Sequence, residues 1–296
     1  MRGASLNVLV AVLFFSCQNS PTKSTYISGT TNILVDESIA PIIEDQAYIF
    51  ENTYADAKLN LVCKSENELM GLFLNDSIRI AILSRELTKE EASFYQNRKV
   101  TIRTNQFATD AIALITHQTN PDSTITTQLI YDMLQGKKVT NKTFVFDNKN
   151  SSTVRYFKQL ANVANLPSSG VYALQSNADV IKYVYEHPNA IGVVGVNWIY
   201  QPDKNLEPIV AKLRVMGVKN IAGKLGSDAY YKPSQNNIAQ GLYPFTRSLY
   251  VVNCEGGPTL GAGFASFLAS ERGQRMVLKS GLLPYNIPSR EVIIKK

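Results

Sequence analysis

The sequence contains few of the residues that build metal sites and hydrolytic active sites. Its 296 residues include only two histidines, His117 and His187, and three cysteines. Because zinc sites need clusters of His and Cys, we expect no zinc site. The same shortage of histidine argues against a Ser-His-Asp enzyme. We therefore expect no catalytic residue, no bound metal and no cofactor.

Long runs of basic residues are also missing. The formal net charge is +6, and half of it comes from Arg2, Lys295 and Lys296 at the two ends. Since no patch interleaves aromatic and basic residues, we expect no nucleic-acid partner. With 45% hydrophobic and 18% charged residues, the chain can bury the core of one large or two modest domains.

The N-terminus is typical of a secretory signal. A charged start is followed by Leu6 to Phe15, which is mostly apolar but too short to span a bilayer. Cys17 stands where bacterial lipoproteins carry the cysteine that is lipidated, although Phe14 replaces the usual aliphatic residue. A buried or free Cys17 behind an ordinary signal peptide is the alternative. We expect a lipoprotein signal peptide over residues 1–17 and a polar tether over residues 18–24.

A strand, a serine and a helix follow one another three times before residue 100. Apolar strands are predicted near the start of each unit, and the loops after them hold Ser38, Ser65 and Ser84. Alternating units of this kind favour a parallel sheet flanked by helices. In such sheets ligands bind beyond the carboxyl ends of the strands, where helix N-termini converge. The three serines are therefore candidate ligands.

The stretch 143–158 repeats the pattern in the second half of the chain. A short strand, TFVF, precedes a helix that we expect to begin near Ser152, and the loop between them holds Asp147, Ser151 and Thr153. Free N–H groups and the helix macrodipole make such an N-terminus favourable for an anion. A plain N-cap is the alternative for any one hydroxyl, but three in a row exceed what one cap needs.

The remaining chain continues the alternation of strands and helices. We predict strands at 111–116 and 190–197 and one within 245–253, and helices at 128–135, 180–186, 262–270 and 271–279. Residues 201–241 are polar and weakly periodic, so we predict irregular structure there.

Eight segments together resemble a known family. They run in family order and cover nearly everything after Tyr26: FENTYADAKLNLVCKSENE, AILSRELTKEE, TDAIALITHQTNPD, LQGK, FDNKNSSTVRYF, NADVIKYVYEHPNAIGVVGVNW, YPFTRSLYVV and GFASFLASERGQRMVLKSGLLP. As an ordered set they resemble the phosphate-binding proteins of Pst-type ABC transporters, within the type II periplasmic binding-protein superfamily, in a divergent lipoprotein branch.

The resemblance implies an α/β fold of two lobes. Each lobe would be a mostly parallel sheet flanked by helices, and two crossover strands would form the hinge. The chain would leave the first lobe near Phe107 and return near 243–250. We therefore expect residues 25–107 and 246–296 to form lobe I, and residues 108–245 to form lobe II.

Cys63 and Cys254 remain in the mature chain. An export route permits a disulfide. The implied fold, however, seats the two cysteines several strands apart, whereas a disulfide needs Cα atoms within about 7 Å. We predict no bridge.

The resemblance also implies a ligand site. The family binds phosphate without its hydration shell, through hydroxyl and backbone N–H groups of four loops. In this sequence the four loops hold Ser38, Ser65, Ser84 with Arg85, and Ser151, Ser152 and Thr153.

Two charged residues depart from the family pattern. Family members usually carry an Asp in the third loop and an Arg shortly before the fourth, whereas this chain has Arg85 and Asp147, and Ser152 replaces a Gly. We expect Arg85 to be the cation of the site, because a guanidinium matches an oxyanion bidentately. A surface ion pair with Glu86 or Glu90 is the alternative. Asp147 could accept the proton of HPO₄²⁻, which sulfate lacks; a turn-forming role is its alternative.

Other polar residues near these loops are interpreted structurally. Asp36, Glu37 and Glu66 open helices, where acidic side chains complement the dipole. Arg247 lies in the returning crossover and is expected to brace the hinge. Trp198, the one tryptophan, is expected in the core.

The resemblance implies a monomeric, lipid-anchored periplasmic solute-binding protein. It would capture an inorganic oxyanion, with phosphate the favoured ligand, and deliver it to ABC permease subunits. A two-lobed sensor or adaptor without high-affinity anion binding is the alternative. An exported hydrolase is disfavoured, because we find neither nucleophile–base pairs nor metal ligands.

Overall fold

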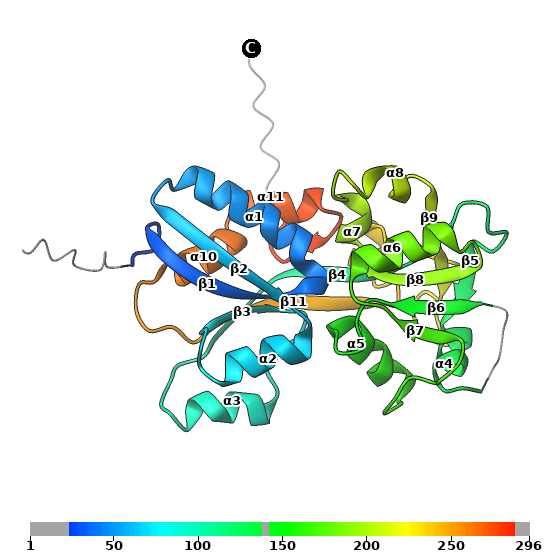
Figure 1. Cartoon of the computed structure of the whole chain (residues 1–296), viewed down its shortest axis with the longest axis horizontal. Helices are drawn as coiled ribbons and strands as arrows, with labels where there is room; N and C mark the ends of the chain where they lie inside the picture. The colour runs from blue at the N-terminus through cyan, green and yellow to red at the C-terminus, as the bar shows by residue number, and fades with distance from the viewer. Residues whose placement is uncertain (1–23, 138–141, 288–296) are drawn as a thin grey trace, which may run out of the picture.

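The computed structural model describes residues 24–137 and 142–287, so Cys17 lies outside the described ranges. Its main sheet has the strand order β2-β1-β3-β11-β4-β8-β6-β7, and β9 and β12 also pair with β4. Strand β1 is parallel to β2 and β3, and β6 is parallel to β7 and β8, whereas β11 and β4 run antiparallel to their neighbours. Two parallel halves are thus joined through two antiparallel strands (Figure 1).

We call the half with β1 to β3 lobe I and the half with β6 to β8 lobe II. The elements of lobe I are β1 (Gly29–Asp36), η1 (Glu37–Ile39), α1 (Ala40–Thr53), β2 (Ala57–Lys64), α2 (Glu66–Leu74), β3 (Ile80–Leu83), α3 (Lys89–Gln96), α10 (Leu260–Ala269), α11 (Glu271–Lys279) and β12 (Leu283–Pro284). The elements of lobe II are β5 (Thr124–Thr126), α4 (Thr127–Leu134), β6 (Thr143–Phe146), α5 (Ser152–Ala161), β7 (Val171–Ala173), α6 (Asn177–Glu186), β8 (Ala190–Gly195), α7 (Asn197–Tyr200), α8 (Glu207–Val210), β9 (Leu213–Val215), β10 (Gly217–Lys219) and α9 (Gln235–Ala239).

The expected two-lobe α/β fold, with parallel sheets and two crossover strands, is confirmed. The crossovers are β4 (Arg103–His117) and β11 (Thr246–Asn253), which run side by side between the lobes in Figure 1. Strand β4 pairs with β11 through its first half and with β8 and β9 through its second half. The lobe boundaries given above fall within β4 and next to the start of β11, and their positions stay a prediction.

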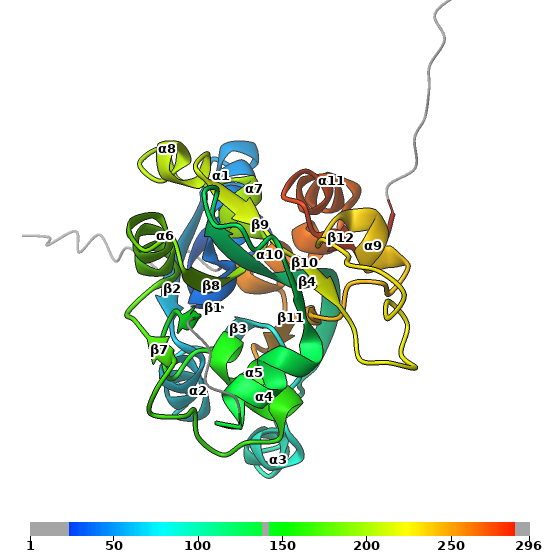
Figure 2. The ribbon, with the colours of Figure 1, turned by 90° about the vertical axis from the view of Figure 1, so that its right-hand side faces the viewer.

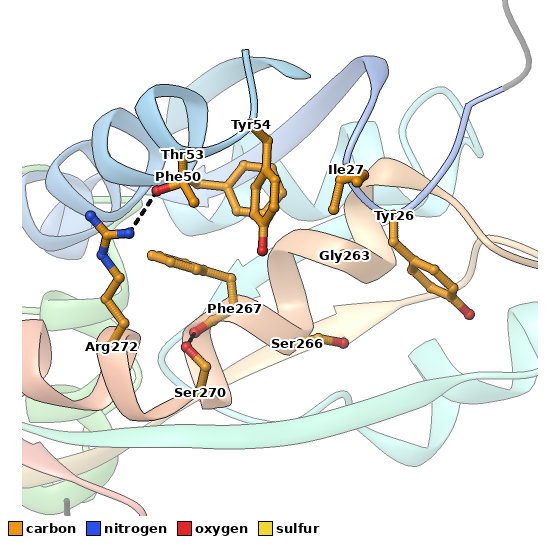
Figure 3. Close-up of a pocket in the computed structure, with 10 residues that line it drawn as sticks. All are labelled: Tyr26, Ile27, Phe50, Thr53, Tyr54, Gly263, Ser266, Phe267, Ser270 and Arg272. Carbon is orange, nitrogen blue, oxygen red and sulfur yellow. Dashed lines mark hydrogen bonds between the residues drawn. The ribbon is translucent and has the colours of Figure 1, made fainter. Parts of the chain in front are cut away.

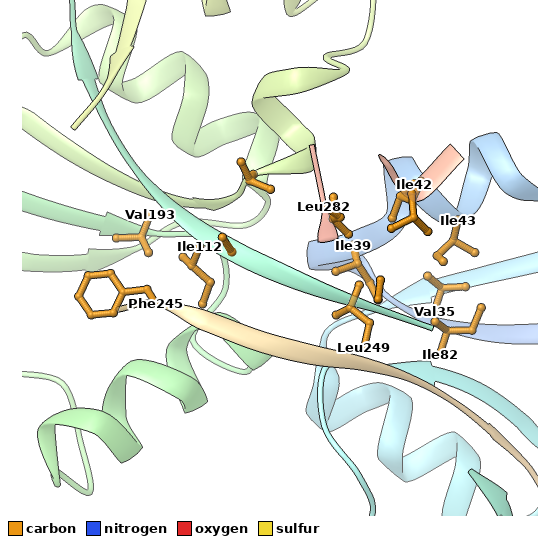
Figure 4. Close-up of a cluster of buried hydrophobic side chains, with 14 of the residues drawn as sticks. Val35, Ile39, Ile42, Ile43, Ile82, Ile112, Val193, Phe245, Leu249 and Leu282 are labelled. Carbon is orange, nitrogen blue, oxygen red and sulfur yellow. The ribbon is translucent and has the colours of Figure 1, made fainter. Parts of the chain in front are cut away.

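One hydrophobic core continues from lobe I into lobe II along the crossover strands. It includes Ile39 of lobe I, Ile112 and Leu249 of the crossovers, and Val193 of lobe II, all with no exposed surface (Figure 4). Burying a side chain of this size contributes about 1.5–3 kcal/mol. The crossover strands are therefore packed against both lobes and are not free linkers. This packing fixes the position of the strand ends of lobe I relative to those of lobe II.

The segment 201–241 was predicted to be irregular, which is wrong in part. It contains the short elements α8, β9, β10 and α9, of which β9 pairs with β4 and β10 pairs with β5. Helix α9 lies beside β12 and α11 (Figure 2), and Gln235 at its start donates to the carbonyls of Leu278 and Leu282. Elements of three to five residues are too short to show a period in the sequence.

Both cysteines of the described chain are free, as predicted. Cys63 lies in β2 and Cys254 follows β11, and β1 and β3 lie between those strands in the sheet. With strands about 4.8 Å apart, the thiols are well beyond the reach of a disulfide. Within residues 24–137 and 142–287, the helices are all too short or too polar to cross a bilayer.

Candidate anion site

The loops that follow β1, β2 and β3 lie next to one another at one edge of lobe I. Asp36 at the end of β1 is in register with Lys64 of β2, and Val35 is in register with Ile82 of β3. The serines that follow these strands, Ser38, Ser65 and Ser84, are all buried. The strand–serine–helix pattern thus brings three hydroxyl groups to one strand-end edge, as parallel sheets require.

A buried arginine joins this edge to lobe II. The Arg247 guanidinium donates from Nη2 to Oγ of Ser38 and from Nη1 to Oγ of Ser152, both at 2.9 Å. Its Nε donates to Oδ2 of Asp110 at 2.9 Å, and Asp110 faces it across the crossover pair. The Arg247 and Asp110 side chains are only 2% and 0% exposed. We call these four residues the Arg247 cluster.

The cluster holds hydroxyl groups from both lobes within hydrogen-bond distance. Oγ of Ser38 lies 3.1 Å from Oγ of Ser152. Trp198 of α7 makes a second contact between the lobes: its Nε1 donates to the backbone carbonyl of Ser38 at 3.0 Å. Its partial exposure and this hydrogen bond place Trp198 at the lobe interface, so the expectation of a core tryptophan is only partly met.

Several buried hydroxyl groups around the cluster have no hydrogen-bond partner among the described residues. They are Oγ of Ser65, Oγ of Ser84 and Oγ1 of Thr153. Ser65 stands at the N-cap of α2 yet makes no capping bond with its side chain. Leaving a buried polar group unpaired costs about 1–3 kcal/mol. Three such groups lie on loops of both lobes.

The fourth loop divides its hydroxyls between structure and site. Ser151 caps α5, accepting from the backbone N–H of Val154 at 3.1 Å and donating to Oδ1 of Asp147 at 2.5 Å. Asp147 is fully buried and also accepts from Nδ2 of Asn177 at 3.2 Å. The N-cap interpretation therefore applies to Ser151, whereas Ser152 joins the cluster and Thr153 stays unpaired.

Two carboxyl groups near the cluster have raised pKa values. Burial raises the pKa of Asp147 to about 6, although the hydrogen bond from Ser151 acts in the opposite direction. Burial and the nearby Asp147 carboxylate raise the pKa of Glu37 to about 7. Burial alone would lower the pKa of Arg247, but the carboxylates of Asp110 and Asp36 raise it, so the guanidinium stays charged. The site therefore combines one permanent cation with carboxyl groups that titrate near neutrality.

Arg85, expected to be the cation of the site, is placed differently. Its Nε donates to Oε1 of Glu66 at 2.6 Å, and Nη1 and Nη2 donate to the two oxygens of Glu91 at 2.7 and 2.8 Å. The ion-pair alternative thus describes this placement, although with partners other than Glu86 and Glu90. The cation at the strand ends is Arg247, which had been interpreted as a hinge brace.

The pairing of Asp110 with Arg247 is not predicted in the sequence analysis, although the sequence contains a signal for it. Each is a charged residue inside an otherwise apolar crossover strand, FATDAIALIT and TRSLYVV. A charge in such a strand is costly unless it is paired, so two of opposite sign in two strands that run together are a usable signal. Asp36 opens a helix, as predicted: it is the N-cap of η1, and its Oδ1 accepts from both N and Oγ of Ser38.

The structure also has a cavity of about 510 Å³ at the far end of lobe I. It lies where α1 ends and the described chain begins, and its lining includes the aromatic side chains of Phe50, Tyr54 and Phe267 (Figure 3). Arg272 in its wall donates to Oγ1 of Thr53 at 2.8 Å. None of its lining residues belongs to the loops that follow β1, β2 and β3 or to the Arg247 cluster, so this cavity is separate from the candidate anion site. Among the described residues, no three His, Cys, Asp or Glu side chains group as metal ligands would.

Two curated phosphate-binding proteins are similar to the chain over most of its length. The chain is 23% identical to the phosphate-binding protein PstS of Pseudomonas aeruginosa, over 93% of this chain and 88% of that protein. It is 25% identical to the phosphate-binding protein PstS of Borreliella burgdorferi, over 93% of this chain and 95% of that protein.

Solved structures show the same fold. A Clostridium perfringens substrate-binding protein with bound phosphate, assigned to a phosphate ABC transporter, matches with a TM-score of 0.71 and 21% identity, over 87% of this chain and 100% of that one. An ABC-type phosphate transport receptor from Vibrio cholerae matches with a TM-score of 0.60 and 19% identity, over 86% and 99% of the two chains. A family model described as a PBP superfamily domain matches residues 20–272, and the chain therefore belongs to the PBP superfamily.

Proposed function

We propose that the protein is a solute-binding protein that captures phosphate between its lobes for an ABC transporter. The observation that carries the proposal is the Arg247 cluster, in which one buried guanidinium holds serine hydroxyls of both lobes. Relatives that are phosphate-binding proteins over nearly their full length support phosphate as the ligand. Binding without turnover follows from this role.

We infer that the anion is held by Arg247 together with hydroxyl groups. Ser38 and Ser152 already lie on the guanidinium, and the unpaired hydroxyls of Ser65, Ser84 and Thr153 are available to donate to further oxygens. Charge-assisted hydrogen bonds from an arginine are the strongest of these interactions. Ser151 supports the loop through its cap rather than through the ligand, and a direct role for Arg85 in ligand binding stays a prediction.

The carboxyl groups favour an anion that carries a hydrogen. Oδ2 of Asp36 is buried without a partner among the described residues, and each oxygen of Asp147 has a second lone pair. Hydrogen phosphate can donate to such an acceptor, whereas sulfate would meet an unpaired carboxylate. We therefore expect Asp36 and Asp147 to disfavour sulfate.

Calorimetric titration of the purified protein with phosphate and with sulfate at pH 7 tests the proposal. Phosphate should bind with at least 100-fold higher affinity than sulfate, equivalent to about 2.7 kcal/mol. Binding of neither anion would contradict the transporter role and would favour the sensor or adaptor interpretation. Release of phosphate from a phosphoester would favour the hydrolase interpretation.

We also propose that the protein is exported and lipidated on Cys17. In this proposal it acts as a monomer and delivers its ligand to permease subunits. The apolar N-terminus and the polar residues 18–24 support this proposal. Cys17→Ser should move the protein from the membrane fraction to the soluble fraction while phosphate affinity stays the same, because Cys17 is not one of the residues that hold the anion in this proposal. Wild-type protein that already fractionates as soluble would refute the anchor.

A further inference from the structure

A second polar network joins the lobes beside the Arg247 cluster. Nε of Arg155, in α5 of lobe II, donates to Oε1 and Oε2 of Glu66, in α2 of lobe I, at 2.8 and 2.9 Å. Next to it the backbone N–H of Asn67 donates to the carbonyl of Asn150 at 3.2 Å. These residues belong to the first turns of α2 and α5 or precede them directly. The two helices that begin at candidate anion loops are thus tied to each other.

Lobe I holds Glu66 in place independently of lobe II. Arg85 donates to Oε1 of Glu66 at 2.6 Å and is itself fixed by Glu91, whose two oxygens accept from its Nη atoms. The Glu66 side chain is 3% exposed, whereas the Arg155 side chain is 25% exposed. When the lobes separate, Glu66 keeps Arg85 and loses Arg155. A carboxylate that is already oriented loses little side-chain entropy when it binds its second arginine.

The location of the Glu66–Arg155 ion pair indicates that it contributes to closure of the two lobes rather than to contact with the ligand. Arg155 and Asn67 line a polar cavity of about 680 Å³ whose wall also includes Lys149 and Lys158. Arg155 therefore stands at the solvent-facing edge, and within the described residues its side chain bonds Glu66 and Gln159 rather than the Arg247 cluster. Arg155 is nevertheless less than one helical turn beyond Ser152, so moving α5 moves both residues together.

We propose that Glu66 and Arg155 form a latch that sets how long the lobes stay closed over the anion. This proposal rests on the proposed phosphate-binding function and adds to it the groups that control release. Arg85 acts as a positioning residue that keeps Glu66 ready for Arg155. The latch slows opening without distinguishing phosphate from sulfate, because it touches neither the cluster nor the free hydroxyls.

A double-mutant cycle on the full chain tests the latch. Arg155→Gln, Glu66→Gln and the double variant are compared with wild type by stopped-flow release of phosphate. Closure is followed by the emission of Trp198, the one tryptophan, which bonds Ser38 across the lobes. Since Glu66 is buried and Arg155 is partly exposed, each single variant should release phosphate about tenfold faster, and the double variant should be no faster than either. The ratio of phosphate to sulfate affinity should not change.

Lys158→Gln is the matched control. It removes one positive charge from the same helix, and among the described residues no ion pair of Lys158 is found. Its release rate should equal that of wild type. Acceleration equal to that of Arg155→Gln, or a double variant whose effect is the product of the two single effects, would overturn the latch.

Small-angle X-ray scattering with no phosphate added separates the latch from the proposed function. Arg155→Gln should have a larger radius of gyration than wild type, because the open form is more populated. An unchanged radius of gyration overturns the latch even if phosphate binds normally. Wild-type protein that binds no phosphate overturns the proposed function, and a larger radius in Arg155→Gln would still support the latch.

Discussion

Replacing Arg247 should separate the cost of a buried ion pair from the contribution of its cation to phosphate binding. The guanidinium is buried against Asp110, with Nη2 also 2.8 Å from Oδ2. Arg247→Gln removes the cation and leaves the carboxylate without an opposite charge in the crossover pair. It also removes the donors to Ser38 and Ser152, so both stability and binding should change.

The magnitude follows from burial. Breaking a buried ion pair by removing one partner costs about 3–5 kcal/mol, because the remaining charge is uncompensated. The double variant Arg247→Gln with Asp110→Asn has no such charge, and its amide groups can bond each other. It should regain most of the lost stability. Both variants should still bind phosphate at least about 30-fold more weakly, which corresponds to about 2 kcal/mol for a lost charged contact.

The assay combines urea unfolding, followed by circular dichroism, with calorimetric titration of phosphate. Arg103→Gln is the control, because Arg103 lies in β4, the crossover strand that pairs with the strand of Arg247, but is exposed. It should change the free energy of unfolding by no more than about 0.5 kcal/mol and leave phosphate affinity unchanged. Wild-type phosphate affinity in the double variant would refute Arg247 as the cation of the anion site.

Three further changes test other parts of the structure. Asp147→Asn should stabilise the protein above pH 6 by at most about 3 kcal/mol, because the cost of ionising the buried carboxyl builds up between its ordinary pKa of 3.8 and its raised pKa of about 6 and is complete above that; an equal gain in urea unfolding at pH 4 would contradict this. Gly195→Ala would place a Cβ 2.8 Å from the carbonyl oxygen of Ser38 in the other lobe. This clash should oppose closure of the lobes and weaken phosphate binding in a calorimetric titration; unchanged affinity would argue against closure at this contact. Cys63 and Cys254 should both be alkylated in denatured, unreduced protein and only slowly in native protein, since burial raises the pKa of each thiol to about 11; peptide mapping that finds either one blocked would contradict the free thiols.

The fold could be predicted because its signals are local. Apolar runs followed by Ser38, Ser65 and Ser84 mark the ends of parallel strands, and the hydroxyl run at Ser151 marks the start of α5. Each signal needs only a few neighbouring residues. The strands β9 and β10 of segment 201–241 could not be found in this way, because they are stabilised by pairing with distant strands.

The charged part of the site depended on contacts that no local pattern shows. The sequence favours Arg85 over Arg247 as the cation, but the position of each guanidinium depends on which carboxylate it meets. Glu91 of a capping box and Glu66 of α2 hold Arg85. Asp110 holds Arg247, because the register of the crossover strands places them opposite each other. Such partners are decided by tertiary structure.

The crossover topology has a consequence for how the chain acquires its structure. Lobe II is built from one continuous segment, whereas the sheet of lobe I is complete only when β11 pairs with β3, as Val251 does with Ile82. Contacts between residues this distant in sequence form slowly, because a long loop must close first. We therefore expect lobe II to fold first and lobe I to stay incomplete until the C-terminal part of the chain is present. An exported chain would expose the edge of β3 during that interval, and a chaperone that covers strand edges would protect it.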